Sequence, residues 1–591
     1  MAAGSFLVEN KLRPGCYIQI KGVPKASSDM SERGTVVVLM NADSGALLTN
    51  ITANDILTGG SSAKGFPLSM FTDTKGILNY VYPYVNEIYI GRLNYGGTKA
   101  QAVLLSSGTP AVAAHGSASI SDGVGGTNTL VVTAVTPGVS GNSLKVVISI
   151  KSADVIEITV MGEGSSVLAT AEISGVISGS SGLAEMNVAP LSNYVVFSGD
   201  SPVGLSTTEQ ITLSGGADAV VGDALLSANA KYDGTFGNKL SVLIVAESSG
   251  EGKYKGAGFF VKTSLDGEVV DNQNVKLPSE IKDNDYITFV KASGLSVLSA
   301  VASVDLAGGT NGTESDGNLT KILGRLKELS WNTLAFCGKA ANRTVINSYI
   351  NNLRENHGKY RQAVLFNHAS SDYEGIISPF QAFVVDDDDI DWLETENSDP
   401  AEEALRLEAL RIRQLFAVAF VAAITAGSDV NISNSHAPVP ANVTAVIPAP
   451  DEDPDVEEDL RAGLLTFTRD SSNQIVIEKD INTLHTYTQI KTAPFSKNRV
   501  IRTLDELSNT KVLVWERMFI GKIDNNSTGR NLLKTQILAI VKRLADLGAL
   551  VSEDSIITVE PGDDVDKVRS YETVRPIDSM EQLYSYVTVL G

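Results

Sequence analysis

The sequence predicts an α+β multidomain protein with a mixed α/β core, inserted β-rich modules and an extended strand arm at each end of the chain. Three observations lead to this prediction. The chain has 591 residues, more than one hydrophobic core usually organises. Helix and strand patterns alternate in some regions and not in others. One set of motifs occurs twice in the same order.

The two ends of the chain carry the signals of the arms. Within residues 1–22, alternate positions share a face of an extended segment, with Cys16, Ile18 and Ile20 on one face and Tyr17 and Gln19 on the other. Residues 579–591 contain a second strand pattern that includes Tyr586, Val587, Thr588 and Val589. A short terminal strand has no partner in its own neighbourhood, so we expect it to pair with a distant part of the chain or with another chain.

Residues 23–105 predict a small α/β unit. Strand patterns at 35–40 and 87–93 flank a helix-like stretch at 71–84. The composition then shifts to Gly, Ser, Thr, Val and Ala with short alternating runs, which indicates β structure up to about residue 311.

This β-rich stretch contains an internal repeat. The motifs at 137–144, 193–197 and 213–216 recur at 233–240, 285–289 and 306–309. Because order and spacing agree, we expect two tandem copies of one module, residues 106–217 and 218–311. A shared Gly-x-x-Gly-Asn element is interpreted as a turn that needs positive φ at its glycines, with a structural role.

An α/β pattern returns in residues 312–446. Helices at 319–329 and 344–356 and strands at 333–336 and 362–366 alternate, which predicts parallel strands with crossover helices. The best-marked helix has Asp399 as its cap, Pro400 at its first position and Glu402 as the reciprocal cap. It is nearly all apolar from Leu415 to its end at Gly427, so its second half should be buried.

Residues 447–578 predict a C-terminal α+β domain. After an acid- and proline-rich link come a strand pair at 463–467 and 474–477 and helices at 504–518 and 529–547. The last helix has an apolar inward face of Leu533, Ile537, Ile540, Val541, Leu544 and Leu547, with Gly548 as its stop. Its polar side carries Arg530, Lys534, Lys542 and Arg543.

Composition excludes several classes of protein. Hydrophobic residues make up 43% of the chain, which is typical of a globular protein. The 47 basic and 69 acidic residues give a net charge of −22, which argues against a nucleic-acid partner. The longest apolar run, 415–426, is shorter than the ~20 residues of a bilayer span, so we expect no membrane insertion. No secretory signal is recognised, so we expect the cytoplasm where the protein is made.

Catalytic and metal-binding signatures are absent from the sequence. Cys16 and Cys337 lack the spacing of a zinc site and are expected to be inert thiols. The five histidines occur singly, and no phosphate-binding loop, metalloprotease or nucleophile-elbow motif is present. The acidic run 386–389 lacks the glycine and closing glutamate of a calcium loop. We expect no enzyme activity, cofactor or metal.

Several long runs resemble one protein family. They are residues 478–484, 495–505, 521–526, 529–530 and 575–581, joined upstream by 422–427 and 13–17. In this order they closely resemble the tail sheath protein of contractile phage tails, in the form found in Gram-positive bacteria. The resemblance covers nearly the full chain except residues 106–217. Cys16 departs from the family, which usually has an aliphatic residue at that position.

The resemblance implies a structural subunit. Such subunits stack as six-fold rings around an inner tail tube, and contraction drives the tube through the target envelope. The expected partners are further copies of the chain, the tail tube protein, and baseplate and tail terminator proteins. The expected location is the virion tail, with the host cytoplasm during assembly. The terminal strands would link subunits, and the basic helix side would face the tube, although ordinary solvation of that side explains it equally well.

Other interpretations stay open at this point. The chain could belong to a bacteriocin-like tail or another contractile injection system. The β-rich modules could instead indicate an adhesin or receptor-binding protein. Within a sheath subunit, the modules could bind a host surface, or they could be a stabilising spacer, which we favour.

Overall fold

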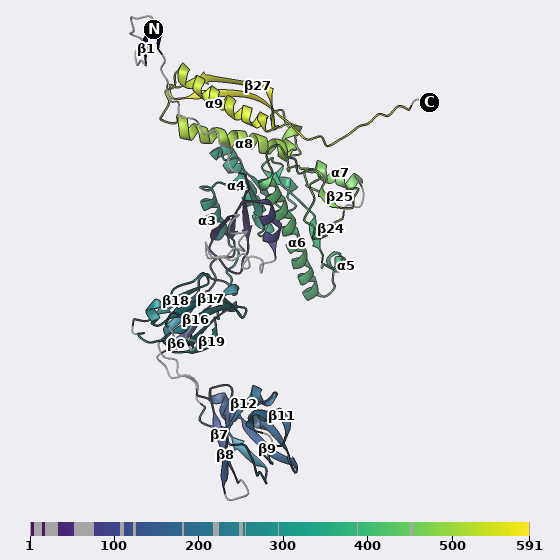
Figure 1. The fold of residues 1–591 in the computed structure, drawn as a ribbon. Coiled ribbons are helices and arrows are strands. Elements are labelled where there is room, and N and C mark those ends of the chain that lie inside the picture. The colour runs from purple at the N-terminus through teal and green to yellow at the C-terminus, as the bar shows by residue number, and fades with distance from the viewer. Residues whose placement is uncertain are drawn as a thin grey trace.

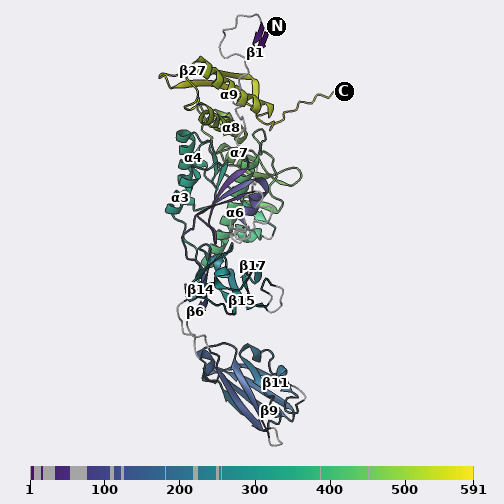
Figure 2. The ribbon, with the colours of Figure 1, turned by 60° about the vertical axis from the view of Figure 1, so that its left-hand side comes forward.

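The structure of the protein is a computed structural model. It describes residues 2–4, 15–17, 33–52, 76–106, 112–121, 126–179, 182–216, 224–247, 252–254, 256–293, 295–386, 388–449 and 453–589. These residues form an outer β module, an inner β module, an α/β core and a C-terminal domain, which follow one another along the molecule (Figure 1). Figure 2 shows the same order from a second side, with both termini at the end that carries the C-terminal domain.

The α/β core is built on a six-stranded sheet with the order β22-β21-β20-β3-β5-β4. Its strands are β22 (Ile376–Ile377), β21 (Gln362–Val364), β20 (Thr333–Phe336), β3 (Thr35–Met40), β5 (Glu87–Arg92) and β4 (Leu48–Thr52). All neighbours are parallel except β4 and β5. The sheet therefore joins strands from the predicted 23–105 unit to strands from the predicted 312–446 core.

Both faces of this sheet are buried, as its apolar strands require. In β3, Val36, Val38 and Met40 pack with the cluster around α6 (Pro400–Gly427). Val37 and Leu39 pack on the other face, with α3 (Asp316–Leu326) and α4 (Arg343–His357). The predicted parallel strands with crossover helices are confirmed.

Helix α6 begins as predicted, with one change. The Asp399 carboxylate accepts a hydrogen bond from Ala401 N at 2.8 Å. The second carboxylate of the cap is Glu403, which accepts from Asn397 N, rather than the predicted Glu402. The apolar second half is buried. By length and composition alone α6 could cross a membrane, but most of its apolar segment is buried inside the protein.

Short elements complete the core. The two-stranded sheets are β23 (Ala382–Val385) with β24 (Val443–Ile447), and β25 (Phe467–Arg469) with β26 (Ile475–Ile477). The helices are α5 (Ile390–Glu394) and α7 (Asp453–Arg461), and α7 lies where an irregular link was predicted.

The helix predicted at 71–84 is wrong for its described part. Residues 71–75 lie outside the described residues, and the rest forms two 3₁₀ turns, Ile77–Tyr80 and Tyr82–Tyr84. Pro83 cannot donate a backbone hydrogen bond, which disfavours a continuous α-helix. The rings of Tyr80 and Phe416 stack at 4.4 Å, so aromatic packing holds the turns on α6.

The two β modules share one topology, which confirms the repeat. The outer module has sheets β11-β10-β9-β13 and β12-β8-β7, and the inner module has β17-β16-β15-β19 and β18-β14-β6. The outer strands are β7 (His115–Ser121), β8 (Thr127–Ala134), β9 (Lys145–Ser152), β10 (Val155–Met161), β11 (Val167–Ser174), β12 (Val195–Gly199) and β13 (Glu209–Thr212). The inner strands are β6 (Gln101–Ser106), β14 (Ala224–Ala230), β15 (Leu240–Ala246), β16 (Phe259–Leu265), β17 (Glu268–Val275), β18 (Ile287–Lys291) and β19 (Val301–Asp305).

The copies are nested rather than tandem, which corrects the prediction. Strand β6 precedes the outer module, β14 follows it, and the two strands pair with each other, with Ser106 opposite Ala224. The outer module is therefore inserted into the first strand connection of the inner module. The first strand of the inner module, residues 101–106, also lies outside the predicted boundaries 218–311.

The repeated Gly-x-x-Gly-Asn element is structural, as predicted. Its first glycine has positive φ in both copies, 120° at Gly138 and 132° at Gly234. The second position needs glycine because a larger side chain would not fit. A Cβ on Gly237 would lie 2.8 Å from the Cβ of Ala100. The Asn142 side chain exchanges two hydrogen bonds of 2.8 Å with the backbone of Gly216. Asn238 does the same with Gly309, so in each module the asparagine ties the turn to the segment that follows the last strand.

A buried polar network joins the inner module to the core. The Arg92 guanidinium donates to Asp233 O at 2.8 Å and lies 3.3 Å from the Asp233 carboxylate. The same carboxylate accepts from the backbone N–H groups of Gly96 and Gly97. The equivalent of Asp233 in the outer module is Pro137. The hydrophobic clusters differ in the same way. The outer module has a cluster of its own, whereas the cluster of the inner module is continuous with the cluster around α6.

We expect the outer module to be removable. Replacing residues 107–223 by Asn-Gly should close β6 and β14 as a hairpin, because Ser106 and Ala224 are already opposite each other. The shortened chain should keep its cooperative unfolding by circular dichroism, and isolated residues 112–216 should show an unfolding transition of their own. An unfolded shortened chain would contradict the nested arrangement.

Candidate functional site: the C-terminal domain and the terminal arms

The C-terminal domain is a layer of helices and a β-hairpin. Helix α8 (Asn498–Val514) lies against the core, and α9 (Ser527–Asp546) and the hairpin of β27 (Leu550–Pro561) and β28 (Val568–Pro576) lie beyond it (Figure 1). Helix α8 starts earlier than predicted, and the hairpin was not predicted. Of the residues predicted on the inward face of α9, only Leu547 is exposed. Gly548, the predicted stop, follows the helix and has positive φ.

A buried ion pair fixes this domain to the core. The Arg354 guanidinium of α4 donates to both oxygens of the Asp505 carboxylate of α8, at 2.7 and 2.8 Å. Both side chains are at most 10% exposed. Beside this pair, the Asn509 side chain exchanges two hydrogen bonds with the backbone of Tyr360. Helix α8 is thereby held in one position on α4 and the segment after it.

A second buried network lies within the runs that carry the family resemblance. The Asp480 carboxylate accepts hydrogen bonds from Asn498 Nδ2 at 2.9 Å and from Arg502 at 3.0 Å. Asn482 Nδ2 donates to Phe495 O at 2.8 Å. Because these side chains are buried, the runs at 478–484 and 495–505 help to maintain the fold of the domain.

The C-terminal arm leaves the domain as an extended segment (Figures 1 and 2). The Glu581 carboxylate accepts hydrogen bonds from Lys497 and from Ser435 Oγ, and these contacts anchor the start of the arm. Beyond this anchor, Leu583 is 91% exposed, Val587 82% and Val589 86%. The predicted strand, including Tyr586 and Thr588, is not formed in the single chain, because a strand needs a hydrogen-bonding partner.

The N-terminal arm differs from its prediction in one respect. Strand β2 (Gly15–Tyr17), which contains Cys16, pairs in parallel with β1 (Ala2–Gly4). The strand therefore has a partner within its own arm, although neither strand pairs with another element of the described chain. The predicted positions Ile18, Gln19 and Ile20 lie outside the described residues.

The β27–β28 hairpin offers open strand edges. Among the described residues, each strand pairs only with the other, so each keeps an outer edge of free backbone groups. One face of the hairpin is covered by the apolar cluster with α8 and α9. Such an edge, already supported by a packed face, suits the addition of a further strand.

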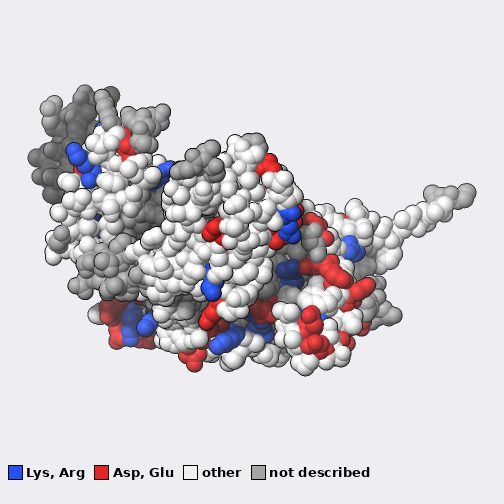
Figure 3. All heavy atoms as spheres, turned by 90° about the horizontal axis from the view of Figure 1, so that it is seen from below, with Lys and Arg blue, Asp and Glu red and all other residues white. Residues whose placement is uncertain are grey.

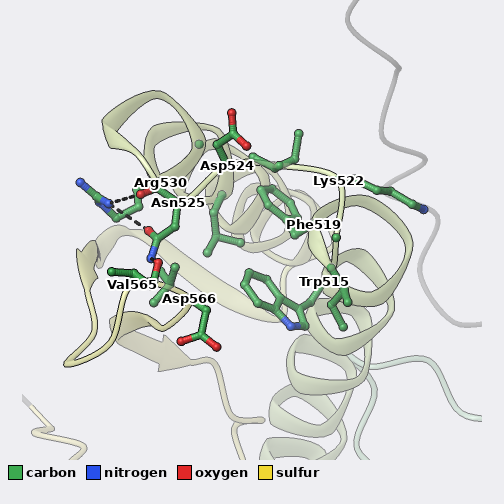
Figure 4. Close-up of a pocket in the computed structure, with 14 residues that line it drawn as sticks. Trp515, Phe519, Lys522, Asp524, Asn525, Arg530, Val565 and Asp566 are labelled. Atoms are coloured by element: carbon green, nitrogen blue, oxygen red, sulfur yellow. Dashed lines mark hydrogen bonds between the residues drawn. The ribbon is translucent and has the colours of Figure 1, made fainter.

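The four basic residues of α9 lie in different surroundings. Lys534 and Lys542 are exposed on one outward stripe, with Leu538, 41% exposed, between them. Arg530 is half-buried and donates to Asn525 Oδ1 at 2.9 Å (Figure 4). Arg543 is also half-buried. Only the two lysines are therefore placed as a surface that a partner could contact freely.

Two observations concern possible metal sites and reactive thiols among the described residues. Within the ranges that the structure describes, no group of three or more histidine, cysteine or acidic side chains could hold a metal ion. Burial raises the pKa of the Cys337 thiol to about 12, so this thiol is unreactive, as expected.

Comparison with known proteins defines the class. The family model for the phage tail sheath protein central domain matches residues 313–483, and that for the phage tail sheath C-terminal domain matches residues 490–589. These two adjoining matches support a phage tail sheath protein. The chain is therefore a structural component of a phage tail, and its family assembles as oligomers with other tail components.

Individual relatives agree with this class. The phage-like element PBSX protein XkdK of Bacillus subtilis (strain 168) is 29% identical over 390 residues, which are 62% of this chain and 78% of that protein. A sheath tail protein from Desulfitobacterium hafniense is similar in structure, with a TM-score of 0.57, 20% identity and coverage of 95% of this chain and 100% of that one. One from Listeria innocua has a TM-score of 0.58, 20% identity and coverage of 93% of each chain. These two structures show that the fold is shared.

The Arg354–Asp505 pair gives a stability prediction. Arg354→Met should lower the free energy of unfolding by about 3–5 kcal/mol, because Asp505 would stay buried without its partner. The measurement is denaturant unfolding. As a control, Arg461→Met removes an exposed pair with Glu457 and should cost less than about 1 kcal/mol. Equal effects of the two variants would contradict the role assigned to the buried pair.

Glu581 gives a pH prediction. Partial burial raises the pKa of its carboxyl, but hydrogen bonds from Lys497 and Ser435 outweigh that effect and leave the pKa below its usual value. The charged anchor is therefore complete above the usual glutamate pKa of about 4.3 and is lost as the pH falls through the lower pKa of the folded state.

A spin label on Gln582→Cys, in a Cys16→Ser background, would measure this anchor. The label should become more mobile as the pH falls through that range. With Glu581→Gln added, mobility should be high at every pH. A label whose mobility does not change with pH in the chain that keeps Glu581 would show that Glu581 does not hold the arm.

Proposed function

We propose that this sheath subunit polymerises as stacked six-fold rings around an inner tail tube and contracts to drive the tube through the envelope of a target cell. The observation that carries the proposal is the combination of an unpaired C-terminal arm with open strand edges on the C-terminal domain. Each copy therefore carries both a strand to donate and an edge to receive one.

Strand exchange gives links that survive a large rearrangement. Main-chain hydrogen bonds join the arm of one copy to the sheet of another, and they do not depend on how the two bodies are oriented. The segments around the arms act as hinges, while the interfaces between bodies repack. The extended state is a kinetic trap, so firing needs no nucleotide, and no phosphate-binding loop is present in the sequence.

The outward stripe of α9 is the proposed contact with the tube. Lys534 and Lys542 provide positive charge on a chain whose net charge is −22, and Leu538 adds an apolar contact between them. Weak polar contact of this kind holds the tube without locking it. Arg530 and Arg543, also expected on this surface, contribute less because they are half-buried.

The outer module is best explained as a spacer. Seen from the end that carries this module, the surface consists mostly of residues other than Lys, Arg, Asp and Glu (Figure 3). Its two aromatic side chains, Tyr194 and Phe197, both contact its own core. On the face seen in Figure 3, the described residues of the module therefore form no charged patch, and its two aromatic side chains pack on its own core, which weighs against the adhesin alternative.

The wider setting follows from the same proposal. The subunit would act without catalysis in the tail of a virion, after assembly in the host cytoplasm, with the tail tube, baseplate and tail terminator proteins as partners. A bacteriocin-like or other contractile injection system would use the same subunit in the same way, and a neighbouring capsid gene would distinguish them.

Truncation tests the arms. Deleting residues 1–21 or 579–591 should abolish tubular polymers, because strand exchange is lost. Electron microscopy of the protein, alone and co-expressed with its tube protein, provides the measurement. The matched control replaces residues 107–223 by Asn-Gly, which removes more of the chain but should leave tubes intact. Normal tubes from either arm truncation would refute strand exchange by that arm.

Charge reversal tests the contact with the tube. Lys534→Glu with Lys542→Glu should still give a sheath but release the tube from it, in electron micrographs of co-expressed proteins. Lys321→Glu, on an exposed position of α3, is the control and should change nothing. If assembled tails form as before with the double variant, these lysines only solvate the helix.

A further inference from the structure

A hydrogen-bonded route links the places where the two arms join the body of the subunit. Arg33 is the first described residue after the N-terminal arm, and Glu581 lies where the C-terminal arm leaves the C-terminal domain. Between them runs the linking segment, residues 428–435, which follows α6 and forms no helix or strand. Its contacts reach both arms.

Arg33 closes the end of α6, where the linking segment begins. Its guanidinium donates to Thr425 O at 2.8 Å and to Ser428 O at 2.9 Å. A cation suits this end of a helix, because the last carbonyl groups have no partner within the helix. Desolvation and the neighbouring positive charge of Arg502 lower the pKa of Arg33 to about 10, so Arg33 stays charged at neutral pH. The cap therefore fixes the start of the linking segment.

From Ser428 the contacts continue to the C-terminal arm. The Ser428 hydroxyl lies 2.6 Å from Asn434 Oδ1, and Asn434 N donates to the Asp480 carboxylate at 3.0 Å. Asp480 N donates to Ser435 Oγ at 3.0 Å, and Ser435 Oγ donates to the Glu581 carboxylate at 2.8 Å. Each contact shares a residue with the next or follows it in the chain, so the route is continuous.

The middle of the route has unused hydrogen-bonding capacity. The Arg502 side chain is 1% exposed and contacts the Asp480 carboxylate and Ile432 O through Nη2. Its Nε and Nη1 are buried and have no partner in the part of the chain that the structure describes. An arginine can bind a carboxylate through two parallel hydrogen bonds, which are stronger than one. Asp480 can therefore exchange its contact with the linking segment for a second contact with Arg502.

We propose that the linking segment couples the two arms, so that loosening the Arg33 cap also releases the anchor of the C-terminal arm at Glu581. The segment has two arrangements. In the first, Arg33 and Asp480 hold the segment, and Ser435 holds Glu581. In the second, Asp480 binds Arg502 through both carboxylate oxygens and the segment shifts. Ser435 then no longer holds Glu581.

The coupling is a property of the single chain, and its use in an assembly rests on the proposed strand exchange. In the proposed polymer, the two arms of one copy are held by other copies. A pull on the N-terminal arm would act on Arg33 and thereby change how firmly the C-terminal arm is held. None of the residues on the route belongs to the six-stranded core sheet, so this change needs no rearrangement of that sheet.

A spin label on Gln582→Cys, in a Cys16→Ser background, reports the anchor in the full-length chain at a dilution where sedimentation shows monomers. Arg33→Met should raise the ratio of mobile to immobile label about twofold or more, as expected for residues of one network. Arg361→Met is the matched control, because Arg361 also donates to two backbone carbonyl groups just after a helix, in this case α3. The control should leave the ratio unchanged. Equal effects of the two variants would reflect a general loss of stability and overturn the coupling.

Ser435→Ala tests the route itself. This change removes one contact of Glu581 and should raise the mobility of the label on its own. Adding Arg33→Met to the Ser435→Ala chain should cause no further rise, because the route is already cut. A further rise as large as in the chain that keeps Ser435 would show that Arg33 acts elsewhere, and would overturn the role of the linking segment.

A reciprocal measurement covers the case in which the Arg33→Met chain does not fold. Coupling between two sites acts equally in both directions, so Glu581→Gln should loosen the Arg33 cap. Gly34 N donates to Ala426 O at 3.0 Å beside the cap. Its hydrogen exchange should become about twofold faster or more in the Glu581→Gln chain. Unchanged exchange at Gly34 would overturn the coupling, whereas strand exchange is decided separately by the truncated chains in electron micrographs.

Discussion

The position of α8 on the core depends on the pair between Arg354 and Asp505, and every proposed assembly surface is placed relative to α8. The pair is buried and bidentate, so any tilt of α8 would leave two charges without partners in an apolar environment. At the other end of the core, Arg92 holds the inner module through both the backbone oxygen and the carboxylate of Asp233. Buried polar contacts therefore join the inner module to the core and the core to the C-terminal domain. In the proposed assembly, relative motion between copies would be left to the arms.

Features with local signals could be predicted from the sequence. The Asp399 cap and apolar half of α6, most of the buried face of α9 and the first glycine of each repeated turn follow from residue spacing, and the structure confirms them. It corrects the reciprocal cap to Glu403 and leaves Leu547 exposed. The nested order of the modules could not be predicted, because the strands that show it, β6 and β14, pair across the whole outer module. The 3₁₀ turns at Ile77–Tyr84 depend on packing against α6, which helical spacing does not reveal.

The candidate site was predictable in part. The charge of the α9 lysines and the strand character of the arms are visible in the sequence. The β27–β28 hairpin is mostly exposed and its register shifts between Val551 and Ile556, so its alternation gave no clear strand pattern. The route from Arg33 to Glu581 joins distant parts of the chain and has no signal in any one of them. The family runs at 478–484 and 495–505 contain buried polar contacts within the domain, whereas those at 521–526 and 575–581 are largely exposed.

The nested insertion of the outer module also has a consequence for variation between related tails. The chain enters and leaves the outer module through one strand pair of the inner module, β6 and β14. The hydrophobic cluster of the outer module is separate from the cluster that the inner module shares with the core. A single recombination event could add, remove or exchange the module without changing any residue in the core or the C-terminal domain. The exposed end of the subunit can therefore diversify independently of the parts that must fit other copies.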